Sequence, residues 1–147
     1  MNLRKIGNKM VLTPEHDKLV CYLMDKNNIK KLFPELTTDD FKINCEQPIL
    51  LKGGYYKSVI GFWDIVIHFQ TQIIHPDWKE RINHRFYIEI KPKIESFGST
   101  LRQIKKYMLY TDFADGICQI ILFTLDKTFD KEFDSQGIKV IHPNGEV

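Results

Sequence analysis

The stretch GICQIILFTL, residues 116–125, decides the fold class because it is almost continuously apolar. A strand that faces water on one side alternates apolar and polar residues, whereas a strand buried on both faces is an unbroken apolar run. The helical segment before it, residues 95–113, places Leu101, Ile104 and Met108 on one side. A buried strand that is entered through a helix implies a crossover connection. We therefore expect an α/β fold, a mixed central sheet flanked by helices.

Three further strands are expected upstream of that helix. Their segments are rich in Val, Ile, Phe, Tyr and Trp, the residue types that favour strands. We assign them to FKINCEQPILL (41–51), SVIGFWDIVIHFQTQII (58–74) and FYIEIKPKI (86–94). The polar stretch between the last two, residues 75–85, is expected to be a connection that inserts a hairpin loop, and KGGYY (52–56) to be a turn.

Helices are expected on both sides of this strand region. Thr13-Pro14 forms a helix start, a capping hydroxyl followed by proline, and an apolar stripe continues to about Asn27. A less regular stretch ends at Pro34. Near the C-terminus, residues 127–137 are expected to form a short polar helix and residues 138–143 a last strand. The predicted order is helix, three strands, helix, strand, helix, strand.

Composition favours one globular domain spanning residues 1–147, with 43% hydrophobic and 27% charged residues. The net charge of +2 is too mild to indicate a nucleic-acid partner by itself. The cysteines Cys21, Cys45 and Cys118 form no CxxC pair, which argues against a zinc ribbon or a Cys-ligated iron–sulfur cluster. No apolar run is long enough to span a membrane, and the N-terminus lacks the apolar region of a signal peptide. We expect a soluble cytoplasmic protein.

Two carboxylates stand out on neighbouring predicted strands. Asp64, in IGFWDIVI, lies among apolar residues, where an aspartate is rarely fully buried unless it is paired. Its alternative explanation is a turn or bulge prompted by Gly61. In YIEIKPK, Glu89 and Lys91 point to one face of a strand, although such pairs are also common on solvated strands. Carboxylates from adjacent strands, with a backbone carbonyl such as that of Ile90, form the hard oxygen site that Mg²⁺ or Mn²⁺ prefers.

The helix after these strands adds a second polar pattern in LRQIKKY. Gln103 and Tyr107 are four residues apart and share one helix face. Arg102, Lys105 and Lys106 could meet a phosphate backbone, or the whole segment could be a solvated amphipathic helix.

Asp64, Glu89-Ile90-Lys91 and Gln103-x-x-x-Tyr107, in this order, resemble the motifs of the PD-(D/E)xK nuclease superfamily. The Q-x-x-x-Y element looks most like its RecB-like and lambda-exonuclease-like branch. The resemblance spans about residues 46–107 and implies a restriction-endonuclease-like αβββαβ core. It departs in having Trp63 in place of proline before Asp64, and a long gap between Asp64 and Glu89.

The resemblance implies a role for each matched residue. Asp64, Glu89 and the Ile90 carbonyl would bind Mg²⁺ or Mn²⁺, and Lys91 would assist the attacking water and the developing charge. Gln103 and Tyr107 would orient Lys91 or the substrate. The family often adds an acid or a histidine on the first helix or a nearby strand, and the candidates here are Glu15, His16 and Glu46. Each of the three has an equally good explanation as a surface residue or, for Glu15, as a first-turn acid.

The substrate class that the resemblance implies is DNA. Basic residues that could contact its backbone are spread along the chain: Arg4, Lys5, Lys9, Lys30, Lys31, Arg102, Lys105 and Lys106. A chain of this size leaves little outside the core for substrate selection, so a homodimer or a partner protein could supply it. Two alternatives stay open: a non-catalytic module with a nuclease fold that binds nucleic acid or protein, and a dimeric endonuclease resembling Holliday-junction resolvases.

Overall fold

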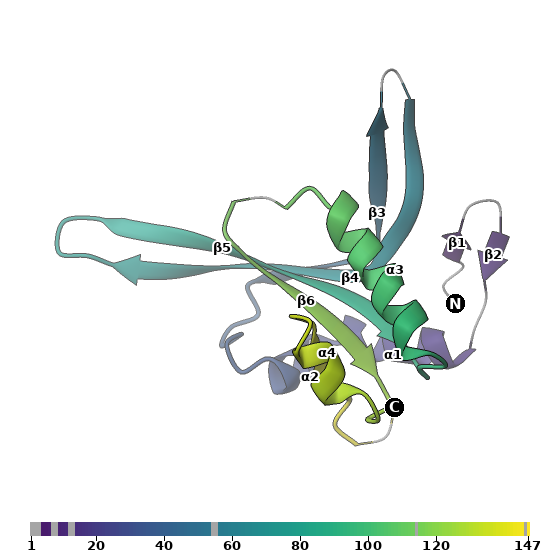
Figure 1. Cartoon of the computed structure of the whole chain (residues 1–147). Helices are drawn as coiled ribbons and strands as arrows, with labels where there is room; N and C mark the ends of the chain where they lie inside the picture. Colours follow the sequence, from purple (N-terminus) through teal and green to yellow (C-terminus); the bar gives the residue numbers. More distant parts are fainter. Residues whose placement is uncertain (1–3, 7–8, 12–13, 54–55, 114, 146) are drawn as a thin grey trace.

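The computed structural model of the chain describes residues 4–6, 9–11, 14–53, 56–113, 115–145 and 147 (Figure 1). Of residues 4–6, 9–11, 52 and 56 it describes the backbone alone. The expected cap at Thr13 and Gly54 of the expected turn lie outside the described residues, as do the side chains of Arg4, Lys5 and Lys9.

A five-stranded mixed sheet forms the centre of the protein, in the order β3-β4-β5-β6-β7 (Figure 1). Its first three strands are antiparallel, and β6 and β7 continue parallel to β5. The strands are β3 (Phe41–Gly53), β4 (Tyr56–Ile74), β5 (Lys79–Lys91), β6 (Ile117–Thr124) and β7 (Lys139–Ile141). The long helix α3 (Phe97–Tyr110) makes the crossover from β5 to β6. The expected α/β class is confirmed, as is the expected order of strands and helices from β3 onward.

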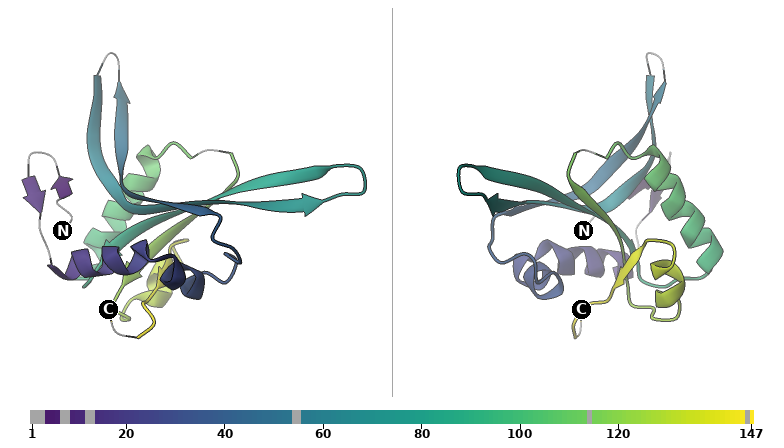
Figure 2. Two further views of the ribbon diagram at one scale, coloured as in Figure 1. Left: turned by 180° about the vertical axis from the view of Figure 1, so that it is seen from behind. Right: turned by 60° about the vertical axis from the view of Figure 1, so that its left-hand side comes forward.

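Helices cover both faces of the sheet, so each face carries its own apolar core (Figure 2). On one face, α1 (Pro14–Met24) and α2 (Lys26–Leu32) pack on alternate residues of the central strands. On the other, α3 and the short α4 (Asp130–Asp134) pack on the intervening residues. Within β6, Ile121 belongs to the first core and Leu122 to the second, and both are fully buried. This explains the unbroken apolar run from which the sheet was predicted.

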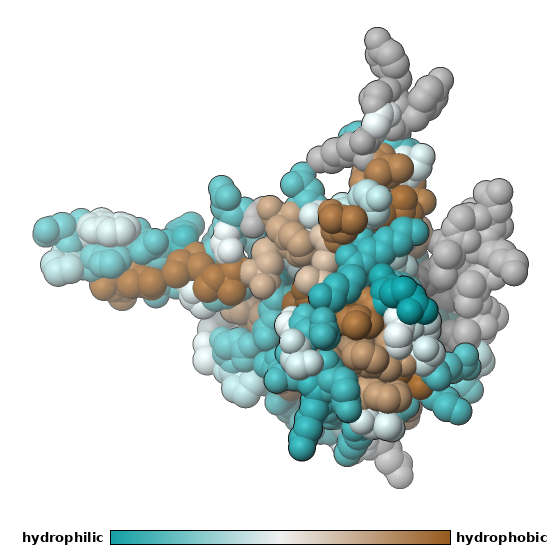
Figure 3. All heavy atoms as spheres, in the orientation of Figure 1, coloured by the Kyte–Doolittle hydropathy of each residue, from teal (hydrophilic) through white to brown (hydrophobic). Residues whose placement is uncertain are grey.

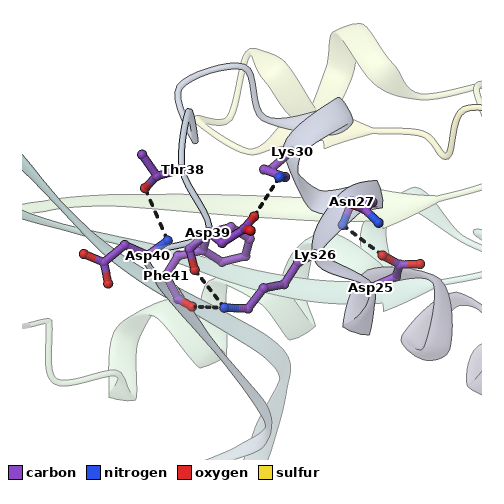
Figure 4. Close-up of polar contacts among 8 residues, drawn as sticks. All are labelled: Asp25, Lys26, Asn27, Lys30, Thr38, Asp39, Asp40 and Phe41. Carbon is purple, nitrogen blue, oxygen red and sulfur yellow. Dashed lines mark hydrogen bonds and ion pairs between the residues drawn. The ribbon is translucent and has the colours of Figure 1, made fainter.

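Two expectations for the N-terminal part are corrected by the structure. The predicted single helix to about Asn27 is interrupted, because the Asp25 carboxylate accepts from the Asn27 N–H at 2.9 Å and begins α2 (Figure 4). The small hairpin of β1 (Arg4–Ile6) and β2 (Lys9–Val11), in which the two strands pair antiparallel, was not foreseen.

The loop after α2 is tied to the start of β3 by two lysines (Figure 4). The Lys26 ammonium donates to the carbonyls of Asp39 and Phe41 at 2.8 and 3.0 Å. The Lys30 ammonium lies 2.6 Å from the Asp39 carboxylate and lowers the pKa of that acid. Lys30, one of the predicted phosphate contacts, therefore already has an anionic partner. These contacts tie α2 to the start of β3.

The polar connection expected at residues 75–85, as an inserted hairpin loop, is wrong in its extent, because residues 79–85 belong to β5. β4 and β5 remain paired from Ile65↔Ile88 out to Ile74↔Lys79, and only residues 75–78 form the turn. The outer part of this hairpin, residues 70–83, projects from the body as an arm (Figures 1 and 2). Within the described residues, no helix is long and apolar enough to cross a membrane.

Candidate active site

The geometry of the site starts where β4 and β5 stop pairing. The last pair in the register is Ile65↔Ile88, so Asp64 and Glu89 are the next residues along the two strands. Beyond this pair, the Asp64 side chain accepts the hydrogen bond that a strand backbone would otherwise accept: the Ile90 N–H donates to Asp64 Oδ2 at 2.7 Å. Asp64 is 1% exposed and Glu89 is 0% exposed. The two acids predicted from the sequence are thus brought together at adjacent positions and are both buried.

Residue 64 also marks a break in the alternation of β4. Trp63 packs in the core under α3, whereas Ile65 packs in the core under α1, although residues two apart normally share a face. On the neighbouring strand, Glu46 has a φ of 52°, an uncommon conformation for a residue other than glycine. Its flanking pairs, Cys45↔Ile65 and Gln47↔Trp63, place it opposite Asp64. The irregular backbone is therefore concentrated at Glu46 and Asp64, in the row of neighbouring strand positions that also carries Glu89.

His16 joins this row from the first helix. Its Nε2 lies 3.2 Å from Asp64 Oδ1, and its side chain is 14% exposed. Glu15, one residue earlier in α1, is exposed, as expected for a first-turn acid. Of the two helix candidates, the structure brings His16 into the site and leaves Glu15 in solvent.

Glu46 is half-buried, and in addition to burial its carboxylate raises the pKa of the neighbouring Cys45 thiol. Burial raises the pKa of Cys45, and the carboxylates of Glu46 and Asp64 raise it further. Cys45 is therefore a natural probe of the charge in this row.

Lys91, Gln103 and Tyr107 frame the site on the side of α3. Lys91, the last residue of β5, is half-buried and shares a strand face with Glu89. On α3, the Gln103 amide donates to the Tyr107 hydroxyl at 2.9 Å. Tyr107 is 4% exposed, and its ring stands edge-on to Trp63 with a centroid separation of 5.6 Å. Tyr107 therefore lies over β4 at Trp63, the neighbour of Asp64, and carries Gln103 with it.

Gly61 is a residue whose role the sequence did not reveal. A Cβ at this position would lie 2.4 Å from the Tyr107 ring, so only glycine lets α3 approach β4 this closely. The glycine thus positions the helix that carries Gln103 and Tyr107. The sequence offered Gly61 as an alternative cause of a turn or bulge and as part of a G-x-x-D pattern that resembles the same family branch, but nothing in it indicated the approach of Tyr107.

The basic residues predicted on α3 point away from the acids. Arg102, Lys105 and Lys106 are exposed, whereas Ile104 and Tyr107 are buried against the sheet. The three cations form a stripe on the outer surface of the helix.

A cleft of about 700 Å³ opens on the α3 face of the sheet, between β3, β4 and the C-terminal end of α3. Trp63 and Tyr87 line it, together with polar residues such as His68 and Arg85 and the C-terminal end of α3. Asp64, Glu89 and Lys91 are not part of its lining. The sequence did not predict this cleft. Arg85 was assigned to a connection, and outside a strand the side of the sheet that a residue faces cannot be inferred.

The donor set fits a hard divalent cation. Within the described part of the chain, no three His, Cys, Asp or Glu side chains converge as a ready-made metal site. Mg²⁺, however, is commonly held by one or two carboxylates plus waters and substrate phosphates. Asp64 and Glu89 supply two such carboxylates, and a cation offsets the cost of burying their charges.

Comparison with protein-family models, curated proteins and solved structures found no match to this chain.

Proposed function

We propose that the chain is a divalent-metal-dependent nuclease of the PD-(D/E)xK type, with a restriction-endonuclease-like core, that hydrolyses phosphodiester bonds in DNA. The observation that carries the proposal is the hydrogen bond from the Ile90 N–H to Asp64 Oδ2. It anchors one acid next to the strand segment Glu89-Ile90-Lys91, at the end of the pairing between β4 and β5. Sequence order alone could not guarantee that these motifs meet.

The proposed metal ligands are Asp64, Glu89 and the carbonyl of Ile90. When bound, Mg²⁺ or Mn²⁺ supplies charge to the phosphoryl oxygen and lowers the pKa of a coordinated water. His16, 3.2 Å from Asp64 Oδ1, orients the Asp64 carboxylate from the other side. Glu46, opposite Asp64 in the register, is close enough in the sheet to add negative charge to the row.

Lys91 is the proposed catalytic cation. It follows Glu89 on the same strand face, at the last residue of β5, where the chain leaves the sheet. An ammonium there holds the attacking water and stabilises the negative charge that develops on phosphate. Gln103 and Tyr107, joined at 2.9 Å, wall the site on the α3 side and limit the positions that Lys91 and the substrate can take.

The test is cleavage by the purified full chain. Linear, circular, single-stranded and four-way-junction DNA are incubated with Mg²⁺ or Mn²⁺, and with chelator. We expect metal-dependent cleavage that falls on the order of 10²- to 10⁴-fold in Lys91→Ala. Lys93→Ala is the matched control, because Lys93 carries the same charge two residues further on and is exposed. Cleavage that Lys91→Ala leaves intact would contradict the assignment.

A non-catalytic binding module is the second candidate, and the near-complete burial of Asp64 and Glu89 favours it. Substrate would have to reach carboxylates that are 1% and 0% exposed. DNA binding without cleavage of any substrate by either metal would support this candidate. Preferred cleavage of four-way junctions by a dimer would instead place the chain with resolvase-like endonucleases.

A further inference from the structure

We propose that the basic face of the β4–β5 arm, residues 70–83, docks in the major groove of duplex DNA. The inference deepens the proposed function by naming B-form duplex as the substrate, and in that respect it rests on the proposed function. The binding itself does not require cleavage.

The arm is a regular two-stranded ribbon. Its register runs without a shift from Phe69↔His84 to Ile74↔Lys79. At the tip, the His75 N–H donates to the Trp78 carbonyl at 2.8 Å, and the two rings stack with centroids 4.0 Å apart. The arm stands away from the body in two different views (Figures 1 and 2).

The two faces of the arm differ in chemistry, and in one view hydrophilic and hydrophobic residues lie along opposite edges of the arm (Figure 3). One face carries Thr71, Ile73 and Ile82, with Phe69 and His84 stacked at its base at 4.5 Å. Residues directly opposite in the register share a face, so the second face is defined by the intervening pairs. Its members are Gln70, Gln72, Ile74, Lys79, Arg81 and Asn83.

The second face is uniformly non-acidic. Lys79, Arg81 and Gln72 are exposed, and Gln70 donates to Asn83 across the ribbon at 2.8 Å. Glu80, the acid nearest to them in the strands, points to the other face and lies 3.3 Å from His75. Within the described residues, neither Lys79 nor Arg81 has an ion-pair partner. Two unneutralised cations beside amide side chains suit a phosphate backbone and base edges.

The same face continues into the body toward the acids. His68 and Arg85, the next opposing pair, line the cleft together with Tyr87. Along β5, alternation then leads from Tyr87 to Glu89 and Lys91. Polar and basic residues therefore follow one strand face from the arm to the cleft, and beyond it Val66 and Tyr87 pack under α3 before the alternation reaches Glu89 and Lys91.

The dimensions of the arm favour B-form DNA over duplex RNA as its ligand. A two-stranded ribbon fits the major groove of B-DNA, about 12 Å wide, whereas the major groove of A-form RNA is too narrow for side chains to read. Arg81 and Glu89 are eight residues apart in β5, which spans about 26 Å at about 3.3 Å per residue. The arm would therefore contact the duplex outside the immediate cutting site.

The test is fluorescence anisotropy of a labelled 20-base-pair DNA duplex, in chelator so that cleavage cannot interfere. We expect Lys79→Ala/Arg81→Ala to weaken binding on the order of tenfold near 0.1 M salt and to make the salt slope shallower by about 2. The control is Lys127→Ala/Lys131→Ala, which removes the same charge from two exposed lysines outside the arm and the site. Duplex RNA of the same length is expected to bind weakly and to lose little in the arm variant.

Three outcomes would overturn the inference: no duplex binding by the unmodified chain, unchanged binding in the arm variant, or an equal loss on DNA and RNA. Loss of binding confined to Lys105→Ala/Lys106→Ala would overturn it too, in favour of the stripe on α3. Binding that depends on the arm in a chain that cleaves nothing would keep the inference and contradict the nuclease proposal. The two failures are therefore distinguishable.

Discussion

The inner and outer halves of the β4–β5 hairpin share one uninterrupted register and differ in everything else. In the inner half, Phe86 through Ile90 are buried between two helical layers. In the outer half, Ile74 is 74% and Trp78 57% exposed, and the ribbon stands alone (Figure 1). A charge in the inner half must have a reason, because burying it costs several kcal/mol without compensation. A solvated charge in the outer half has no such energetic cost. It indicates function only when all the charges on one face have the same sign.

The comparison is tested most strongly by removing one acid from each half. Asp64→Asn is expected to lower cleavage on the order of 10³-fold, the size found on removing one electrostatic group from a transition state. Asp77→Asn, an exposed acid in the turn of the arm, is expected to leave the cleavage rate near that of the unmodified chain. Initial rates with Mn²⁺ decide the matter, and equal effects in the two variants would refute the distinction between the halves.

A glycine pair makes the same comparison in the β3–β4 hairpin. Gly61→Ala places a methyl group 2.4 Å from the Tyr107 ring and is expected to cost about 1–3 kcal/mol of unfolding free energy. At Gly53, near the tip, an added Cβ meets nothing within 4 Å, so Gly53→Ala is expected to change stability by a few tenths of a kcal/mol. Urea unfolding measures both. Equal stability of the two variants would show that α3 does not rest on Gly61.

The third prediction concerns the stability cost of buried acids that serve function. In chelator, Glu89→Gln is expected to raise the free energy of unfolding by about 1 kcal/mol, because it removes a buried charge beside Asp64. Glu95→Gln, at an exposed position, is the control. Saturating Mn²⁺ is expected to reverse the order, since only the unmodified chain gains stability from the bound ion. A destabilised Glu89→Gln in chelator would indicate that Glu89 has a structural role.

The smallest expected effect concerns Cys45. Burial and the carboxylates of Glu46 and Asp64 all disfavour its thiolate, so its pKa lies above the ordinary 9.0 and little thiolate is present at pH 8. In a Cys21→Ser/Cys118→Ser background, alkylation of Cys45 should therefore rise with pH to a midpoint above 9.0. Asp64→Asn should lower that midpoint and so increase the alkylation rate at pH 8. A midpoint at or below 9.0 would contradict the placement of the acids near Cys45.

The main sheet was predictable because its signals are local. The apolar run in β6 and the amphipathic pattern of α3 required the crossover that the structure has. Asp64 and Glu89 were identifiable because acids among apolar residues conflict with strand preference. Their proximity, in contrast, depends on a register that no local pattern specifies.

The arm and the cleft could not be predicted for the same physical reason. The stretch from His75 to Arg85 is polar because its strand faces solvent, and a solvated ribbon has nearly the composition of a loop. The contact between Gly61 and Tyr107 joins residues far apart in the chain and leaves no periodic signal. His16 and Glu15 have the same helical context, and only the packing of α1 on the sheet distinguishes them.

The central claim is that Asp64 and Glu89 bind a divalent metal, and Mn²⁺ titration by isothermal calorimetry tests it most directly. The account predicts saturable binding to the unmodified chain that is lost in Glu89→Gln and retained in Glu95→Gln. Absence of binding, or binding that Glu89→Gln leaves unchanged, would contradict it.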